Sequence, residues 1–122
     1  MMKKKELESY LTSWVESWTG NEPKKLLKYY GSKVVFQDPL NPNGIKGKKE
    51  LEPYLTKLLA KNPKWKWEIK EIIPTKNGCT VKTEATIPSK KKTVIIPCVD
   101  IIEIKGSKIT RNEVYFDRSK LK

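Results

Sequence analysis

Two aspartates, Asp38 and Asp100, carry the clearest chemical signal in this sequence. Asp100 lies inside the most apolar run of the chain, residues 93–104, and Asp38 ends a short apolar run directly before Pro39. A carboxyl group among apolar side chains must be paired, hydrogen-bonded or kept protonated. We therefore interpret Asp100 either as a pocket acid that donates a proton or a hydrogen bond, or as a strand-end acid satisfied by backbone or water. Asp38 is either a base at a pocket rim or an aspartate that caps the turn before proline.

Histidine is absent from the chain. This absence excludes Ser-His-Asp and Cys-His catalytic groups and the common histidine-based zinc sites. Acid–base chemistry therefore falls to carboxyls, lysines, tyrosines or thiols. The two cysteines, Cys79 and Cys98, lack the spacing of metal ligands, and in a reducing compartment we expect free thiols.

The chain length of 122 residues suits one domain, residues 1–122, with one core. Hydrophobic residues make up 37% and charged residues 33% of the sequence. No apolar run is long enough to span a bilayer. The lysines near the start have no apolar stretch behind them, so we expect no secretory signal, no membrane contact and a cytoplasmic location.

The formal net charge is +12, from 26 lysines and arginines against 14 acids. Of the basic residues, Arg111 and Arg118 are the arginines, whose planar guanidinium groups are suited to reading base edges. The lysines are spread along the whole chain. We therefore interpret them as a solvated surface, and we expect weak attraction to polyanions and no specific nucleic-acid partner.

Apolar residues recur at helical spacing in three segments, which predict three helices. The first covers residues 7–18, the second residues 21–31 and the third residues 47–61. Tyr30 falls on the apolar face predicted for the second helix. Asn62-Pro63 then stops the third helix.

Apolar residues that alternate or run together predict strands in the rest of the chain. A short strand ends at Asp38, and the DPLNPNG segment that starts there has the composition of a loop. Asn77-Gly78 is a strong hairpin turn. Helices therefore come first and an antiparallel meander follows, which predicts an α+β fold. The four long strands are expected near residues 65–70, 81–87, 93–104 and 109–116.

Three motifs connect this order of elements to a known family. They read VVFQDP, GIKGKKELEPYL and PCVDIIEIKGSKITRNEVYFDR. Over residues 7–121 the chain resembles the nuclear transport factor 2-like superfamily, and within it the SnoaL-like polyketide cyclase and ketosteroid isomerase branch. The resemblance implies a cone-shaped, curved antiparallel (mixed) sheet wrapped around three N-terminal helices, with a pocket inside. Because the superfamily holds isomerases, cyclases, hydrolases, dehydratases and binding proteins, the resemblance is specific for the fold rather than for one reaction.

The resemblance also implies roles for individual residues. In ketosteroid isomerases the acid at the position of Asp38 is the general base. The acid at the position of Asp100 stays protonated there and donates a hydrogen bond to the developing oxyanion. A tyrosine on the first helix of those enzymes is replaced here by Trp14, whose indole N–H has a different reach. Tyr54, on the third helix, either supplies the missing phenol or is an ordinary core residue with a wetted hydroxyl.

The last strand offers two further candidates, Asn112 and Phe116, which should share one face. The resemblance turns that face to the pocket, so Asn112 would place an amide in an apolar wall. A shift of one residue in register would instead leave Asn112 on the exposed face. Trp65 and Trp67 alternate with charged residues, a pattern more typical of sheet core or a dimer contact than of ligand stacking.

Together these features predict a small-molecule enzyme without a metal or cofactor. Asp38 would abstract a proton next to a carbonyl, and Asp100 would stabilise the enolate of a small apolar or carbonyl-containing molecule. The alternative is a non-catalytic ligand-binding or assembly module on the same fold. Since the family usually dimerises through the outer face of its sheet, we also expect a homodimer. In it, Arg111 of one subunit would meet Glu103 or Glu113 of the other.

Overall fold

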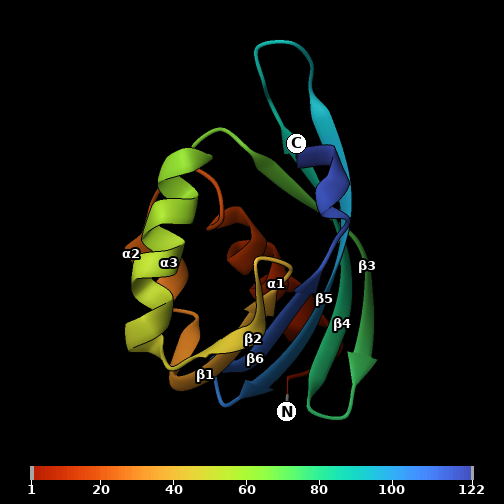
Figure 1. Ribbon diagram of the computed structural model, residues 1–122. Helices are drawn as coiled ribbons and strands as arrows, with labels where there is room; N and C mark the ends of the chain where they lie inside the picture. The colour runs from red at the N-terminus through yellow and green to blue at the C-terminus, as the bar shows by residue number, and fades with distance from the viewer. Residues whose placement is uncertain (1, 122) are drawn as a thin grey trace.

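The computed structural model describes residues 2–121, and in them a six-stranded mixed sheet curves around three α-helices (Figure 1). The strand order is β2-β1-β6-β5-β4-β3. Strands β1 and β6 are parallel, and the other neighbours are antiparallel. The strands are β1 (Tyr30–Asp38), β2 (Asn41–Lys46), β3 (Lys66–Thr75), β4 (Gly78–Ile87), β5 (Val94–Lys105) and β6 (Lys108–Tyr115).

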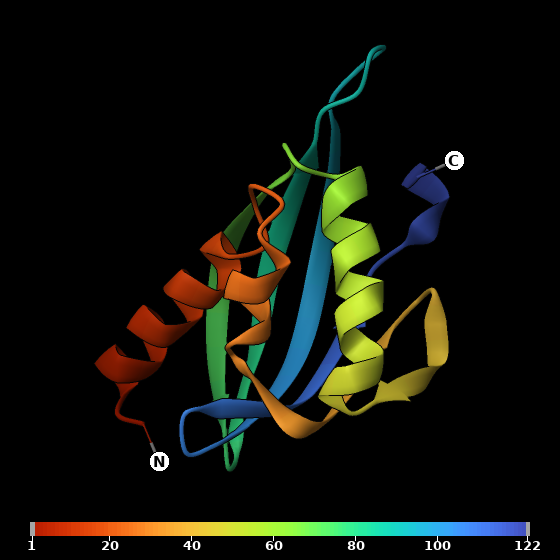
Figure 2. The same ribbon diagram turned by 90° about the vertical axis from the view of Figure 1, so that its left-hand side faces the viewer.

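The helices lie together on one face of this sheet (Figure 2). Their apolar sides supply much of the core, and Leu11, Trp14 and Leu55 are almost fully buried. The first helix ends at Glu16, earlier than predicted, and Trp18 lies buried in the turn that follows. Among residues 2–121, no helix is long and apolar enough to cross a membrane. The helices are α1 (Lys4–Glu16), α2 (Pro23–Leu27), α3 (Lys48–Lys61) and a final short 3-10 helix, η1 (Arg118–Leu121).

The second helix is shorter than predicted, and Tyr30 belongs to a strand. Helix α2 ends at Leu27, and β1 begins at Tyr30, which pairs with Ile109 of β6. The backbone N–H of Ile109 donates to the carbonyl oxygen of Tyr29 at 2.7 Å. Pairing with β6 therefore overrides the helical spacing of this segment. As a result, the Tyr30 side chain is fully buried in the core.

The segment predicted to be a loop after Asp38 contains strand β2. Residues Asn41–Lys46 pair antiparallel with β1, and Ile45 lies opposite Phe36. The loop-like composition was misleading because β2 is an edge strand. An edge strand tolerates a proline such as Pro42, since one side of its backbone has no neighbouring strand to bond.

Strand β5 is the hydrophobic strand predicted for residues 93–104, and it lies between β4 and β6. Cys98, Asp100 and Ile102 are buried on one face, and the residues between them are less buried. Strand β5 also passes close to Gly78, where an added Cβ would lie 2.0 Å from the carbonyl oxygen of Ile102. The predicted hairpin turn therefore requires glycine at that position. The predicted α+β class is confirmed.

Candidate functional site

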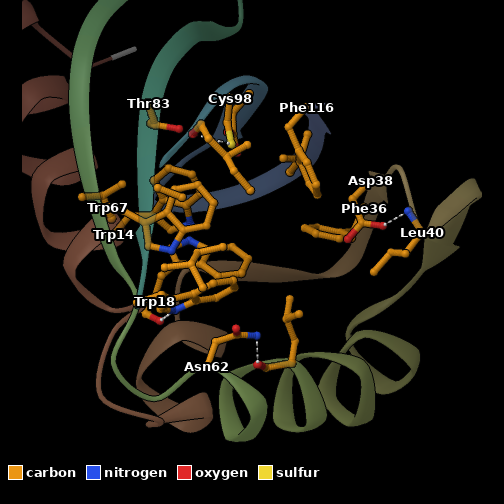
Figure 3. A pocket seen from close by; sticks show the side chains of 18 of the residues that line it. Trp14, Trp18, Phe36, Asp38, Leu40, Asn62, Trp67, Thr83, Cys98 and Phe116 are labelled. Atoms are coloured by element: carbon orange, nitrogen blue, oxygen red, sulfur yellow. Dashed lines mark hydrogen bonds between the residues drawn. The ribbon is translucent and has the colours of Figure 1, made fainter. Parts of the chain in front are cut away.

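A cavity of about 120 Å³ lies between the helices and the sheet (Figure 3). Most of the residues that line it are apolar or aromatic, and the carboxylic acids among them are Asp38 and Asp100. Side chains from both ends of the chain therefore meet around one small apolar space. Figure 3 shows Trp14, Trp18 and Trp67 on one side of it and Phe36, Asp38 and Leu40 on another.

Asp100 lies in the middle of β5, opposite Val81 on β4 and Val114 on β6. Its side chain is 4% exposed and borders the cavity. Burial raises the pKa of this carboxyl from 3.8 to about 7, and a hydrogen bond from Asn112 offsets part of the rise. Near neutral pH, Asp100 is therefore present in both its protonated and its ionised form.

Asp100 stands at the end of a chain of buried hydrogen bonds that reaches α1. The indole Nε1–H of Trp14 donates to the Tyr30 hydroxyl at 3.2 Å, and that hydroxyl donates to Oδ1 of Asn112 at 2.8 Å. Nδ2 of Asn112 then donates to Oδ2 of Asp100 at 2.9 Å. Burial holds the pKa of Tyr30 well above its ordinary value, so the phenol keeps the proton that it donates. The chain therefore fixes which way the Asn112 amide faces.

Asp38 ends β1 and is held mainly by its own turn. Its Oδ1 accepts the backbone N–H of Leu40 at 3.1 Å, and the backbone N–H and side-chain amide of Asn41 at 2.9 Å each. Tyr54 on α3 donates its hydroxyl to Oδ2. This is the turn-capping arrangement considered for an aspartate before proline. The side chain nevertheless borders the cavity, and it is 6% exposed. Asp38 is thus a hydrogen-bond acceptor in a fixed orientation.

Tyr54 is directed at Asp38 rather than at Asp100. Its ring packs beside Phe36, with ring centroids 6.0 Å apart. Burial, followed by the hydrogen bond to Asp38, raises the pKa of Tyr54, so the hydroxyl stays protonated and donates to the carboxylate. The Trp14 indole N–H is likewise bonded to a protein group, the Tyr30 hydroxyl. Neither of the two candidate replacements for the helix tyrosine therefore directs its donor hydrogen at a ligand.

The structure brings five of the six residues proposed from sequence to the wall of one cavity. The exception is Asn112, which is fully buried behind Asp100. Both ends of its amide are used in the bonds to Tyr30 and Asp100, so the amide expected on the wall is a positioning contact instead. The five that line the cavity are Trp14, Asp38, Tyr54, Asp100 and Phe116.

Sequence reasoning missed the role of Tyr30. Trp65 belongs to the hydrophobic core and Trp67 packs against it, as expected, and both also line the cavity. The Trp65 indole N–H donates to the carbonyl oxygen of Trp18 at 2.5 Å. Alternation back from Asp38 gave no signal for Tyr30, because Ser32 in that series is exposed and the pairing of β1 with β6 shifts register between Tyr30 and Val35.

The two cysteines are free and buried. Burial, with a smaller contribution from the Asp100 carboxylate, raises the pKa of Cys79 to about 11 and that of Cys98 to about 12. Neither thiol therefore supplies a nucleophilic thiolate near neutral pH. Within residues 2–121, no group of three or more His, Cys, Asp or Glu side chains is placed to hold a metal ion.

Comparison with solved structures places this geometry in a known fold. A protein with a ketosteroid isomerase-like fold from Catenulispora acidiphila, crystallised with trimethylamine, is 17% identical. It aligns over 91% of this chain and 87% of its own, with a TM-score of 0.79. SalBIII is described as an epoxide hydrolase/cyclase-like enzyme with a role in pyran ring formation in the polyether salinomycin. It is 12% identical and aligns over 98% of this chain and 97% of its own, with a TM-score of 0.82.

A third solved structure supports the same conclusion about the fold. An NTF2-like protein from Cytophaga hutchinsonii is 13% identical over 91% of this chain and 99% of its own, with a TM-score of 0.72. These likenesses confirm the predicted nuclear transport factor 2-like fold. No curated protein matches the chain. A family model of the SnoaL-like domain matches residues 11–112. The chain therefore belongs to the SnoaL-like domain family.

Proposed function

We propose that this protein is a small-molecule enzyme that abstracts a proton next to a carbonyl group. The observation that carries the proposal is the pairing of two different carboxyls on one apolar cavity. Asp38 is an oriented hydrogen-bond acceptor, and Asp100 has a pKa raised to about 7, so that it can carry a proton near neutral pH. Enolisation near neutral pH needs one group that accepts a proton and another that donates a hydrogen bond, and the different environments of these two carboxyls suit them to those two roles.

In the proposed step, Asp38 takes a proton from the carbon beside the carbonyl. The electron pair of that C–H bond moves to the carbonyl oxygen, and the resulting enolate accepts a hydrogen bond from protonated Asp100. Where the substrate has a β,γ double bond, return of the proton from Asp38 to the γ-carbon of the dienolate completes an isomerisation. Where it has a second carbonyl, attack of the enolate carbon on that carbonyl carbon would instead close a ring, and the alkoxide formed would take the proton from Asp38. The turn at Leu40 and Asn41 fixes the base, because it holds Oδ1 while Oδ2 faces Tyr54.

The walls of the cavity support a small apolar ligand. Trp14, Trp18, Trp65 and Trp67 border it, together with aliphatic side chains from the strands. Such walls exclude water, and a hydrogen bond to a developing enolate is worth more where water is excluded. With Trp14 bonded to Tyr30 and Tyr54 bonded to Asp38, the proposal leaves Asp100 as the one donor assigned to the carbonyl oxygen.

Exchange of ketone α-protons in D₂O tests the proposed step without knowledge of the substrate. Proton NMR would follow loss of the α-proton signals of cyclohexanone and 2-tetralone, with protein added. We expect faster exchange than in buffer alone, and a loss of about 10²–10⁴ in that rate for Asp38→Asn. Equal exchange rates with wild type, with Asp38→Asn and with buffer would overturn the proposal.

A second candidate is a ligand-binding module without chemistry, and one observation favours it. Asp38 is satisfied within its own turn, as a purely structural aspartate would be. Such a module would bind small phenols or ketones, and exchange of their α-protons would match the rate in buffer. Binding without exchange therefore decides between the two candidates.

We also propose that the protein forms a homodimer through the outer face of the sheet. Arg111 bonds to Glu103 at 3.0 Å and to Glu113 at 2.5 Å in its own chain, so the contacts expected between subunits are made within one. Tyr115 donates to Glu113 at 2.6 Å and is 45% exposed beside this cluster. Charges already paired cost less to bury in an interface.

Light scattering tests this assembly. We expect a mass near twice 14.2 kDa at micromolar concentration, and a weaker dimer for Arg111→Glu than for the control Lys3→Glu. A mass of 14.2 kDa for the wild-type protein would contradict the proposal.

A further inference from the structure

Polar side chains cross the inner face of the sheet along a single diagonal line. Each member is displaced by two residues along its strand from the position directly opposite its neighbour on the adjacent strand. The displacement alternates in sequence direction, and because these strands are antiparallel, all of the displacements point toward the same end of the sheet. Thr83, for example, lies opposite Cys98, which is two residues before Asp100. Neighbours on such a diagonal have Cα atoms about 7–8 Å apart. We call this line the polar diagonal; its members are Trp67 on β3, Thr83 on β4, Asp100 on β5 and Asn112 on β6.

The two halves of the polar diagonal differ in their hydrogen bonding. Asp100 and Asn112 bond to each other, and Asn112 also bonds to Tyr30. Within residues 2–121, by contrast, the Thr83 hydroxyl and the Trp67 indole N–H are buried and have no hydrogen-bond partner. Both residues line the cavity, and Thr83 is 3% exposed. Buried polar groups without a partner destabilise a fold, so their presence calls for an explanation.

The protein group opposite Thr83 is a poor partner for its hydroxyl. The Cys98 thiol lies directly across the strand pair, and the contact with the Thr83 hydroxyl lowers the pKa of the thiol against the larger effects of burial and Asp100. This contact does not have the geometry of a hydrogen bond, and sulfur is a weak partner in any case. The Cys98 thiol instead contacts the carbonyl oxygen of Ile96 at 3.6 Å.

The Trp67 indole N–H is also buried without a hydrogen-bond partner among the residues that the structure describes. Its N–H group can donate a hydrogen bond but cannot accept one. Its ring packs edge-on against Trp65 with centroids 5.2 Å apart, and phenylalanine would serve that packing without adding a buried donor. Packing therefore explains the ring at this position but not its nitrogen, just as valine would explain the shape of Thr83 but not its hydroxyl.

We infer that Thr83 and Trp67 form a second binding subsite, which holds an acceptor oxygen of the ligand. The inference deepens the proposed function, in which the carbonyl oxygen binds at Asp100. The second oxygen would lie one step along the polar diagonal, roughly 7–8 Å away when measured between the Cα atoms. The substrate class is then a small apolar molecule with a carbonyl at one end and an ether, hydroxyl or second carbonyl at the other.

A matched pair of phenols tests the subsite, because a phenol resembles an enol and binds where the carbonyl would. The pair is 4-methoxyphenol and 4-ethylphenol, which have similar shape but differ by one ether oxygen. Calorimetric titration gives the dissociation constant of each with wild type, Thr83→Val and Trp67→Phe. The preference for the methoxy compound, taken as the ratio of the two constants, should fall about three- to tenfold in each variant.

Two control variants separate the hydroxyl from general effects of mutation. Thr83→Ser keeps a hydroxyl and should keep most of the preference. Thr86→Val removes a hydroxyl from the same strand at an alternate position that does not line the cavity, and it should leave the ratio unchanged. The same ratio in wild type, Thr83→Val and Trp67→Phe, with both phenols bound, overturns the subsite and leaves the proposed enzyme standing. Failure of both phenols to bind the wild-type protein overturns the subsite, and ketone exchange then decides the proposed enzyme separately. A lowered ratio in the variants, with no ketone exchange by the wild-type protein, supports the subsite and contradicts the proposed enzyme activity.

Discussion

The surroundings of Asp38 and Asp100 differ although both acids border one cavity. Asp38 takes its hydrogen bonds from Leu40 and Asn41, two and three residues further along the chain, and from Tyr54. Asp100 depends on burial between neighbouring strands and on Asn112. The first acid is therefore prepared by a local turn and the second by the whole fold. A motif can specify the first environment, but only tertiary packing creates the second.

The largest effect that this difference predicts is on stability. An unfolded Asp100 loses its proton near its ordinary pKa of 3.8, whereas the folded protein keeps it to about 7. Between these values the folded state binds more protons, so stability falls as the pH rises, and the loss is complete above about pH 7. At about 1.4 kcal/mol for each pH unit across this interval, the upper limit of the loss is about 4 kcal/mol.

Urea unfolding of Asp100→Asn and wild type at several pH values measures this loss. We expect the variant to be the more stable protein at pH 8, by up to about 4 kcal/mol, and to lose that advantage near pH 4. The matched control is Glu8→Gln, which replaces an exposed acid on α1. A constant difference between Asp100→Asn and wild type at all pH values would show that Asp100 ionises normally in the fold.

The next effect is on the pH dependence of the proposed reaction. If protonated Asp100 donates to the enolate, ketone exchange should slow above about pH 7, by about tenfold for each pH unit, because the donor is lost. Asp100→Asn keeps a donor N–H at every pH, so its slower exchange should not show this decline. Exchange rates measured by NMR between pH 6 and pH 9 check the prediction. A decline of the same slope in the variant would assign it to another group.

A smaller effect should follow from breaking the chain of bonds behind Asp100. Tyr30→Phe leaves the Trp14 indole N–H and Oδ1 of Asn112 buried without partners. We expect a loss of about 1–3 kcal/mol in the free energy of unfolding. A loosened Asn112 should also let the pKa of Asp100 rise further, since its N–H lowers that pKa. Tyr29→Phe, at the neighbouring position outside this chain of bonds, is the control.

The smallest effect should come from Tyr54, because the turn retains most of the bonds to Asp38. Tyr54→Phe removes one donor and leaves those from Leu40 and Asn41. We expect a loss of about 1 kcal/mol in stability and less than about tenfold in ketone exchange. A hundredfold loss of exchange with unchanged stability would mean that Tyr54 contacts the ligand directly, and the two acids would then differ less than proposed.

Much of the fold was predictable because its signals are local. Alternating apolar residues placed the long strands, and the strand centred on Asp100 turns its acid toward the apolar face as expected. The loop-like DPLNPNG segment was misread because an edge strand such as β2 has few sequence requirements. Tyr30 was misread because Leu26, Leu27 and Tyr30 fit a helix, and only pairing with the distant β6 makes that residue a strand.

The hydrogen-bond partners of the site residues were less predictable than the identity of those residues. The residue types at positions 14, 54 and 112 indicated polar groups near a pocket, but the partner of each group depends on distances that arise only after folding. The Trp14 N–H meets Tyr30, and the Asn112 amide meets Asp100, from elements far apart in the chain. The unpartnered Thr83 hydroxyl had no signal in the sequence, since threonine at that position is an ordinary strand residue.

The most direct measurement is the titration of the Asp100 side-chain carboxyl by ¹³C NMR in the folded protein, with Asp100→Asn used to assign its signal. The contrast between the two acids predicts a midpoint near pH 7 for Asp100, caused by burial and moderated by Asn112. In Asn112→Leu the midpoint should lie higher still. A midpoint near 4 in the wild-type protein would contradict the account, because Asp100 would then be ionised at neutral pH and unable to donate to an enolate.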